Sequence, residues 1–374
     1  MQRLRWFLSV LPLLAAAGGS AWGASPIWIV PDVPTQETAS GTQPLPWQIF
    51  RYDGAVPTYT LELTVPGNPT LDGIERMDRP GSWLFSLDSA SDLGGALPGL
   101  ADPRDVIVYD GTTATYSLFF CGAAAGIPAT SNVDALFLVG GDKGDLAVSF
   151  DVPTQIGPAF YDPGDLVLFK HLAPGCGGWA FSALLFDASA AGIPPRGNVI
   201  GADTCGARLV LSLDVPTDLG PPGIVTYVPG QLPAWTGATY ALFEALAGWP
   251  LSSGVDGLAC AGNPGLIPST LKVNKAVTPG NLQLAWTASC SQGAGNYGIY
   301  EGTIGTWYSH TQIDCADAGA DLTEEITPAA GNRYYLVVPH NVCGEGSYGQ
   351  RTGGIERPVG AVACAGPQIV TSCP

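Results

Sequence analysis

Asp32-Val33-Pro34-Thr35 returns unchanged as Asp151-Val152-Pro153-Thr154 and as Asp214-Val215-Pro216-Thr217. A looser copy reads Asp88-Ser89-Ala90-Ser91, and the four aspartates are spaced by 56, 63 and 63 residues. Each copy ends an apolar run that is typical of a β-strand. A fixed period of this size indicates a repeat architecture, in which each repeat forms one supersecondary unit.

Four repeats follow from this spacing, and they cover residues 26–78, 79–140, 141–203 and 204–262. Each contains four strand-like runs separated by turn residues, which predicts a four-bladed β-propeller. The first repeat begins on a blade's second strand, whereas the fourth ends on a first strand. We therefore expect residues 27–31 to pair with residues 255–259, because this closes the ring and removes an exposed sheet edge. A β-sandwich or an open β-solenoid is the alternative.

The repeated Asp phrase is interpreted as a turn. An Asp carboxylate accepts backbone N–H groups two or three residues further on, Pro presets φ, and the Thr hydroxyl closes the turn from the other side. A turn is needed in every repeat, whereas a ligand site is not.

The innermost strands would begin with similar tetrapeptides. These are Leu71-Asp72-Gly73-Ile74, Val133-Asp134-Ala135-Leu136, Val199-Ile200-Gly201-Ala202 and Val255-Asp256-Gly257-Leu258. The pattern resembles the hydrophobic-Asp-Ala opening of hemopexin-type repeats, whose fold is a four-bladed propeller with ions on its axis. The repeats here are longer than in that family, and Ile200 departs from the pattern.

Asp72, Asp134 and Asp256 would then surround the propeller axis. Three carboxylates in one narrow channel repel one another unless a cation or protons intervene. Ca²⁺ is the natural cation for oxygen ligands of this kind, so the three aspartates are the candidate metal site. The alternative is that these side chains cap turns at the strand starts.

Residues 263–374 do not continue the repeat, and their short strands and regular turns predict a β-sandwich. Leu284-Ala285-Trp286 resembles the second-strand Trp of fibronectin type III domains. The run Tyr334-Tyr335-Leu336-Val337-Val338, followed by Asn341 and Gly344-Glu345-Gly346, resembles their sixth strand and the turn after it. The expected protein is therefore all-β, with a propeller-like domain at residues 24–262 and a fibronectin type III-like sandwich at residues 263–374. Exported bacterial proteins use such sandwiches as spacers or adhesive modules.

The N-terminus has the layout of a secretory signal peptide, with Arg3 and Arg5, an apolar stretch and then small residues. Ala21 and Gly23 predict cleavage after residue 23, and an uncleaved membrane anchor is the alternative. Removing residues 1–23 leaves 13 basic and 32 acidic residues, a net charge of −19. We expect a secreted or cell-surface protein that binds neither nucleic acid nor anionic membranes, because both require basic surface.

Nine cysteines in an exported chain are best interpreted as disulfides, with at least one thiol left over. We expect the bonds to stay within each domain. The predicted pairs are Cys176 with Cys205, Cys290 with Cys315, and Cys343 with Cys364, while Cys121, Cys260 and Cys373 stay open.

Familiar catalytic motifs are absent from the sequence, and His171, His310 and His340 are interpreted as loop or packing residues. Four aromatic residues are candidates for stacking against sugars, with packing between blades as the alternative: Trp47, Tyr109, Trp179 and Trp235. The leading hypothesis is a non-enzymatic exported repeat protein that needs no cofactor and contacts an extracellular protein or glycan in surface interaction or adhesion. A carbohydrate-binding, lectin-like protein and a secreted hydrolase using channel carboxylates are the alternatives.

Overall fold

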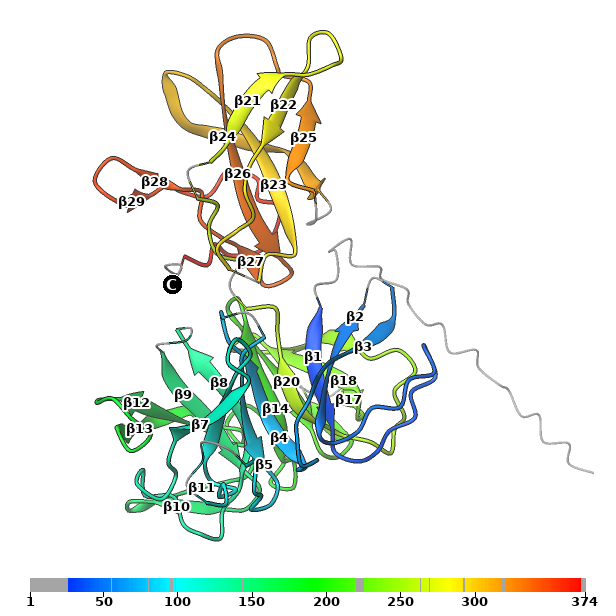
Figure 1. The fold of residues 1–374 in the computed structure, drawn as a ribbon, viewed down its shortest axis with the longest axis vertical. Helices are drawn as coiled ribbons and strands as arrows, with labels where there is room; N and C mark the ends of the chain where they lie inside the picture. The colour runs from blue at the N-terminus through cyan, green and yellow to red at the C-terminus, as the bar shows by residue number, and fades with distance from the viewer. Residues whose placement is uncertain are drawn as a thin grey trace, which may run out of the picture.

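A computed structural model describes residues 26–370, apart from residues 55, 80, 95–96, 98, 141, 143, 220–224, 263, 269, 292 and 318–320. The predicted signal peptide and its cleavage site lie outside this range. The described chain is all-β and is arranged in several small antiparallel sheets, as expected. No helix in it is long and apolar enough to cross a membrane. Figure 1 shows one group of sheets built from the first two thirds of the chain and a second group built from the last third.

Four sheets of four strands each make up residues 27–259, called the four-sheet part below. In the first sheet the order is β4 (Leu71–Arg76), β5 (Trp83–Leu87), β6 (Val106–Asp110), β7 (Thr115–Phe120). The second is β8 (Val133–Val139), β9 (Asp145–Phe150), β12 (Leu166–His171), β13 (Trp179–Phe186). The third is β14 (Val199–Cys205), β15 (Arg208–Leu213), β18 (Gln231–Trp235), β19 (Tyr240–Ala245). Two separate two-stranded hairpins accompany these sheets: β10 (Thr154–Ile156) with β11 (Ala159–Tyr161), and β16 (Thr217–Leu219) with β17 (Val225–Tyr227).

The fourth sheet joins the two ends of the repeat array. Its order is β20 (Val255–Ala259), β1 (Ile27–Pro31), β2 (Gln48–Asp53), β3 (Thr58–Thr64). β1 pairs antiparallel with β20, with Ile29 opposite Leu258, which confirms the predicted pairing of the two ends. The inner strands β4, β8, β14 and β20 lie together at the centre, β4 and β14 each contacting both β8 and β20 (Figure 1).

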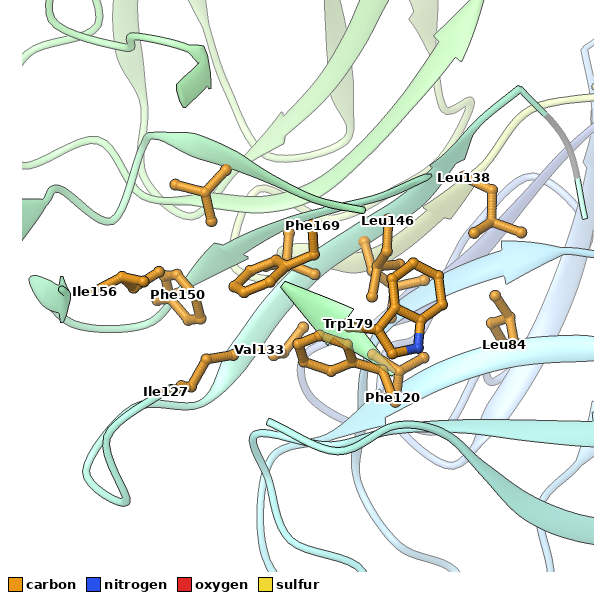
Figure 2. Close-up of a cluster of buried hydrophobic side chains, with 14 of the residues drawn as sticks. Leu84, Phe120, Ile127, Val133, Leu138, Leu146, Phe150, Ile156, Phe169 and Trp179 are labelled. Carbon is orange, nitrogen blue, oxygen red and sulfur yellow. The ribbon is translucent and has the colours of Figure 1, made fainter. Parts of the chain in front are cut away.

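Each neighbouring pair of sheets encloses its own hydrophobic cluster. Between the first and second sheets, Leu84 and Phe120 pack against Leu146, Phe169 and Trp179 (Figure 2). A strand that lies between two such clusters is buried on both faces, so its sequence is continuously apolar instead of alternating. β1 shows this, since all five of its residues are buried and alternate ones point into different clusters.

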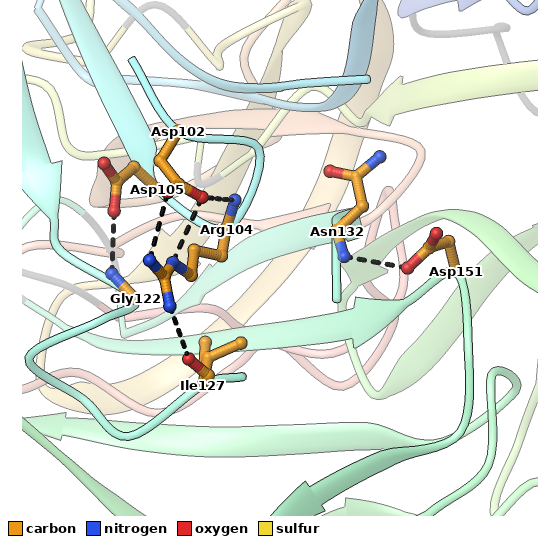
Figure 3. A network of polar contacts seen from close by, with 7 residues as sticks. All are labelled: Asp102, Arg104, Asp105, Gly122, Ile127, Asn132 and Asp151. Carbon is orange, nitrogen blue, oxygen red and sulfur yellow. Dashed lines mark hydrogen bonds and ion pairs between the residues drawn. The ribbon is translucent and has the colours of Figure 1, made fainter. Parts of the chain in front are cut away.

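The repeated Asp phrase forms a turn, although its carboxylates are used differently from the prediction. In all four copies the final hydroxyl donates to the carbonyl oxygen two residues earlier, at 2.8–3.0 Å. The carboxylate of Asp151, however, accepts the backbone N–H of Asn132 at 2.8 Å (Figure 3), and Asp214 accepts that of Asn198 at 3.1 Å. These bonds tie the end of one strand to the start of the inner strand paired with it.

Residues 264–370, called the C-terminal part, contain two further sheets. One has the order β21 (Lys272–Lys275), β22 (Leu282–Ala285), β25 (Thr323–Ile326). The other has the order β24 (Thr306–Asp317), β23 (Asn296–Thr303), β26 (Arg333–Asn341), β27 (Gly344–Glu345), and a small hairpin, β28 (Gln350–Arg351) with β29 (Ile355–Glu356), follows. Leu284 and Trp286 pack between the two sheets against Ile299 and Val337.

The disulfides differ from the prediction. Cys121 is bonded to Cys176, Cys205 to Cys343 and Cys315 to Cys364, while Cys290 is also disulfide-bonded and Cys260 is a buried free thiol. The pairs Cys176–Cys205, Cys290–Cys315 and Cys343–Cys364 are therefore wrong, although each of these six cysteines forms a disulfide.

Loop packing explains the difference. The loop after β7 lies on the loop after β12, where Cys121 N–H donates to the Cys176 carbonyl at 2.8 Å. The β14–β15 hairpin meets the C-terminal part, where Arg208 Nη2 donates to the Val342 carbonyl at 3.2 Å. The Cys205–Cys343 bond thus joins the two parts, so the expectation that every disulfide stays within one domain is wrong. Cys343 belongs to a hydrophobic cluster of the four-sheet part.

Candidate functional site

The three predicted metal ligands lie at the starts of inner strands. Asp72 is the second residue of β4, Asp134 of β8 and Asp256 of β20. Asn132 Nδ2 donates to Asp72 Oδ2 at 2.6 Å, and Asn198 Nδ2 donates to Asp134 Oδ2 at 2.5 Å. The first two carboxyls are therefore hydrogen-bonded to the next repeat.

Burial raises the pKa of all three groups. The pKa of Asp72 lies well above its usual value because of burial and the nearby charges of Asp134 and Asp256. Burial raises the pKa of Asp134 to about 7, and burial together with the charge of Asp32 raises that of Asp256 to about 8. A raised pKa favours the protonated carboxyl, which offers a second way to relieve the repulsion among the three groups.

The structure does not gather these aspartates into a metal-binding group. Within the described residues, no three His, Cys, Asp or Glu side chains are placed to hold a metal ion together. Ile200 occupies the corresponding place on β14, so one of the four inner strands supplies no oxygen ligand there. The calcium site stays a prediction from the sequence.

Further acidic side chains lie near the other ends of the inner strands. Asp203 Oδ2 accepts the Cys260 N–H at 2.5 Å, and burial raises the pKa of Asp203 to about 6. Burial, with the charges of Asp203 and Glu75, raises the pKa of the Cys260 thiol far above its usual value. Cys260 is therefore a protonated thiol in the core and lacks the thiolate that nucleophilic chemistry requires.

Each histidine has structural contacts. His171 is exposed and stacks on the Trp179 ring, with the centroids 4.5 Å apart. His310 is buried between the Tyr334 hydroxyl at 3.2 Å and the Pro358 carbonyl at 3.0 Å, and burial lowers its pKa. His340 is buried as well, and burial lowers its pKa. The placements of His310 and His340 agree with the expected packing roles, whereas His171 ends β12, paired with Trp179 on β13, and does not lie in a loop as expected.

A charged network in the first sheet also has a structural explanation (Figure 3). Arg104 pairs with Asp102 at 3.1 Å and donates to the Ile127 carbonyl at 3.0 Å. The neighbouring Asp105 carboxylate accepts the Gly122 N–H at 2.9 Å. Together these bonds hold the loop that follows β7 against the loop that precedes β6.

The four aromatic candidates for sugar stacking are buried or half-buried, and three of them make ring contacts. Trp179 packs against Phe119 and donates its Nε1–H to the Phe119 carbonyl at 3.0 Å. Tyr109 packs against Tyr116, and Trp235 against Tyr240. Packing within and between the sheets, the alternative stated above, describes these three rings.

Sequence reasoning missed the aromatic residues that are most exposed in the C-terminal part. Trp307 is 64% exposed and Tyr308 is 44% exposed, at the end of the β23–β24 hairpin beside Ile304, which is 51% exposed. The signal was present in the sequence, because large apolar residues flank the turn residue Gly305 on both sides. Turn residues are normally polar, so such a turn indicates an interaction surface.

The hairpin end has an unusual backbone. Tyr308 adopts a φ of +66°, in the left-handed region that a bulky residue rarely occupies. Such a conformation costs on the order of 1–3 kcal/mol and is found preferentially at functional sites. Ser309 Oγ accepts the Thr303 N–H at 3.0 Å and fixes the pairing around this irregularity.

A pocket of about 600 Å³ lies between two loops of the second and third sheets and is lined by residues 192, 194–197 and 215–218. Its walls are mainly Gly and Pro, and its charged residues, Arg196 and Asp218, are exposed. No titratable side chain of this lining is buried, and the buried Thr217 hydroxyl donates to the Val215 carbonyl at 2.8 Å.

Comparison with known proteins gives no family. No model of a protein family matches the chain, and no curated protein matches it. Among solved structures, a search finds PorZ, a bacterial surface component of the type-IX secretion system of Porphyromonas gingivalis, at 10% identity and a TM-score of 0.28, covering 84% of this chain and 49% of that one.

Two extracellular domains of putative hybrid two component systems from B. thetaiotaomicron are also found. BT3049 has 8% identity and a TM-score of 0.25, covering 88% of this chain and 55% of that one. BT4673 has 8% identity and a TM-score of 0.22, covering 83% of this chain and 41% of that one. The chain thus spans about half the length of these proteins, and the TM-scores are too low to support an argument about function.

Proposed function

We propose that this chain is an exported, non-enzymatic protein that acts in surface interaction or adhesion. Its four-sheet part is a four-bladed β-propeller, and its C-terminal part is a fibronectin type III-like sandwich that presents the contact surface. The β1–β20 pairing and the mutual contacts of the inner strands support the propeller. Two sheets packed around Trp286 support the sandwich.

The exposed aromatic hairpin end is the observation that carries this proposal. A folded protein normally buries Trp, and interfaces are enriched in Trp and Tyr. Trp307 and Tyr308 are both exposed on one rigid hairpin, next to an exposed Ile304. Meanwhile, the buried ionisable groups described above are engaged in structural bonds or are held neutral by burial.

The cross-links support an extracellular location. Disulfides persist in oxidising compartments, and here they join loops that are distant in sequence, including 138 residues between Cys205 and Cys343. The formal net charge of −17 keeps copies of the chain apart and disfavours nucleic acid as a partner. Binding to an extracellular surface therefore depends on apolar and hydrogen-bonding contacts more than on charge.

Binding of fluorescent mature protein, residues 24–374, to intact cells and extracellular material of the producing organism tests the proposal. We expect saturable binding that Trp307→Ala weakens and Phe160→Ala leaves unchanged, because Phe160 is an equally exposed aromatic residue (71%) on β11. A parallel screen of ester and polysaccharide hydrolysis should show no turnover. Turnover, or the absence of any saturable binding, would overturn the proposal.

A further inference from the structure

Trp307 and Tyr334 lie together at the end of the β23–β24 hairpin. Their ring centroids are 5.7 Å apart and their planes are inclined by 39°. Trp307 is 64% exposed, while Tyr334 is half-buried beside it. The two rings therefore offer solvent a continuous aromatic surface, called the Trp307–Tyr334 platform below.

The platform is held in place by the residues beneath it. Tyr334 on β26 is paired with Gly302 on β23, and a Cβ atom at position 302 would lie 2.2 Å from Tyr334 Cζ. Only glycine leaves room for the ring in this position. The Tyr334 hydroxyl contacts His310 Nδ1 at 3.2 Å, and the other ring nitrogen of His310 contacts the Pro358 carbonyl at 3.0 Å.

This support fixes the Tyr334 ring before any ligand arrives. Binding then does not have to order a free side chain, which lowers its entropic cost. The left-handed Tyr308 and the Thr303–Ser309 hydrogen bond set the irregular pairing that places Trp307 beside Tyr334. A surface Trp with no function would need none of these arrangements.

We propose that the Trp307–Tyr334 platform binds an uncharged, soluble polysaccharide, an inference that rests on the proposed surface function and names its ligand class. An aromatic face attracts the C–H groups on one face of a pyranose ring while the sugar hydroxyls stay hydrated. Inclined rings follow a twisted chain better than the flat face of a crystalline polymer.

Charge selects among the glycans. Arg333 is the basic residue beside the platform, and its guanidinium is already engaged by Glu301 at 3.6 Å and Thr303 Oγ1 at 2.7 Å. The chain as a whole carries a formal net charge of −17. An acidic or sulfated glycan would be repelled by the net negative charge and would find no unpaired cation at the described hairpin end. A neutral glycan is not repelled and needs no cation, so neither effect lowers its affinity.

Affinity electrophoresis and calorimetry of the mature protein test this with four probes: barley β-glucan and galactomannan as neutral soluble chains, alginate as an acidic chain, and crystalline cellulose as a flat surface. We expect binding to at least one of the first two. Trp307→Ala and Tyr334→Ala should each weaken it at least tenfold, Tyr334→Phe should keep most of it, and Phe160→Ala should not change it.

Stronger binding to alginate or to crystalline cellulose than to the soluble neutral chains would overturn the inference, as would an equal loss in Phe160→Ala. Saturable binding to cells without binding to any neutral polysaccharide would overturn it and leave the proposed surface function standing. Failure to bind both cells and polysaccharides would overturn the two together. Circular dichroism of each variant separates loss of binding from loss of fold.

Discussion

Replacing Asp134 by Asn tests whether the carboxyls at the starts of the inner strands are protonated in the folded protein. Asp134 is 8% exposed, and burial raises its pKa from 3.8 to about 7. A carboxyl whose pKa rises on folding stabilises the fold fully below its unfolded pKa and loses this contribution as the pH climbs to the folded pKa. The full loss amounts to about 4 kcal/mol, of which about 2 kcal/mol falls between pH 5 and pH 7, since one pKa unit corresponds to about 1.4 kcal/mol.

Asn at position 134 keeps an amide oxygen that can accept the hydrogen bond from Asn198 Nδ2, but it carries no charge at any pH. Asp134→Asn should therefore match the wild type below about pH 4 and exceed it by about 2 kcal/mol at pH 5 and about 4 kcal/mol at pH 8, a rise in Tm at pH 8 on the order of 10 °C. Thermal unfolding followed by circular dichroism at pH 5, 6, 7 and 8 measures the difference. Comparing variant with wild type cancels His310 and His340, whose lowered pKa values act in the opposite direction.

Asp187→Asn is the matched control. Asp187 lies in an exposed loop, and the N–H of Ala190 lowers its pKa, so its contribution to stability is complete before pH 5 and should not vary above it. An Asp134→Asn protein that is less stable than the wild type at pH 8 would refute the reasoning. Repeating the series with EDTA then decides whether calcium keeps Asp134 ionised, because chelation would remove the advantage of the wild type.

Three further substitutions test the architecture. Ile29→Ala removes a fully buried side chain from β1 and should cost about 3–5 kcal/mol of unfolding free energy, in a single urea transition of the four-sheet part. Val33 is 44% exposed, so Val33→Ala should change stability by less than about 0.5 kcal/mol. A separate, earlier urea transition in the Ile29→Ala protein would contradict the joining of the two ends. Cys205→Ser opens a bond that spans 138 residues and should cost roughly 5 kcal/mol, and non-reducing peptide maps of the wild type should contain Cys205 linked to Cys343, not to Cys176. Gly302→Ala should displace Tyr334, costing about 1–3 kcal/mol and altering the near-ultraviolet circular dichroism. Gly177→Ala, where an added Cβ meets only Ala124 at 3.6 Å, should leave both unchanged.

The repeat explains why much of the four-sheet part could be predicted from the sequence. The four copies of the Asp motif mark the ends of four strands. Because the repeat array begins on a second strand and ends on a first strand, the first strand of the chain must complete the last sheet. The tetrapeptide predicted to begin an inner strand at residue 133 does begin β8, and the predicted pairing of residues 27–31 with 255–259 is the observed one. Such inferences succeed because each rests on a pattern that recurs or on an edge that must be paired.

The disulfides could not be predicted because cysteine pairing depends on which loops meet in space. Cys176 and Cys205 belong to adjacent repeats of the sequence, but the β14–β15 hairpin packs against the C-terminal part. No repeat relates Cys205 to Cys343, so sequence spacing contains no information about their contact.

The aromatic platform was missed for a different reason. Strand alternation normally says which side chains face the core, but the left-handed Tyr308 breaks the alternation between Trp307 and Ser309. Tyr334 was assigned to a strand correctly, and its exposure depends on Gly302, a residue 32 positions earlier in the sequence. A residue without a side chain leaves no apolar signal, although it decides where the ring lies.

Asp72 and Asp134 form hydrogen bonds between repeats, and the repeat that lacks the aspartate shows how such a bond can be lost. In two neighbouring repeats, an Asn just before the inner strand donates to the Asp of the preceding repeat. Between the third and fourth repeats, Ile200 stands where the Asp would be, and Gly254 stands where the Asn that would donate to it would be. A Cβ atom at Gly254 would lie 2.8 Å from Ile200 Cδ1, so the isoleucine fills the space that the Asn side chain would need. Losing both partners of a buried hydrogen bond together is nearly neutral, whereas losing one leaves the other unsatisfied. This paired replacement agrees with a structural Asp–Asn bond at that junction. At the fourth junction, however, Thr70 stands in place of the Asn while Asp256 is kept, so the same account does not extend to Asp256.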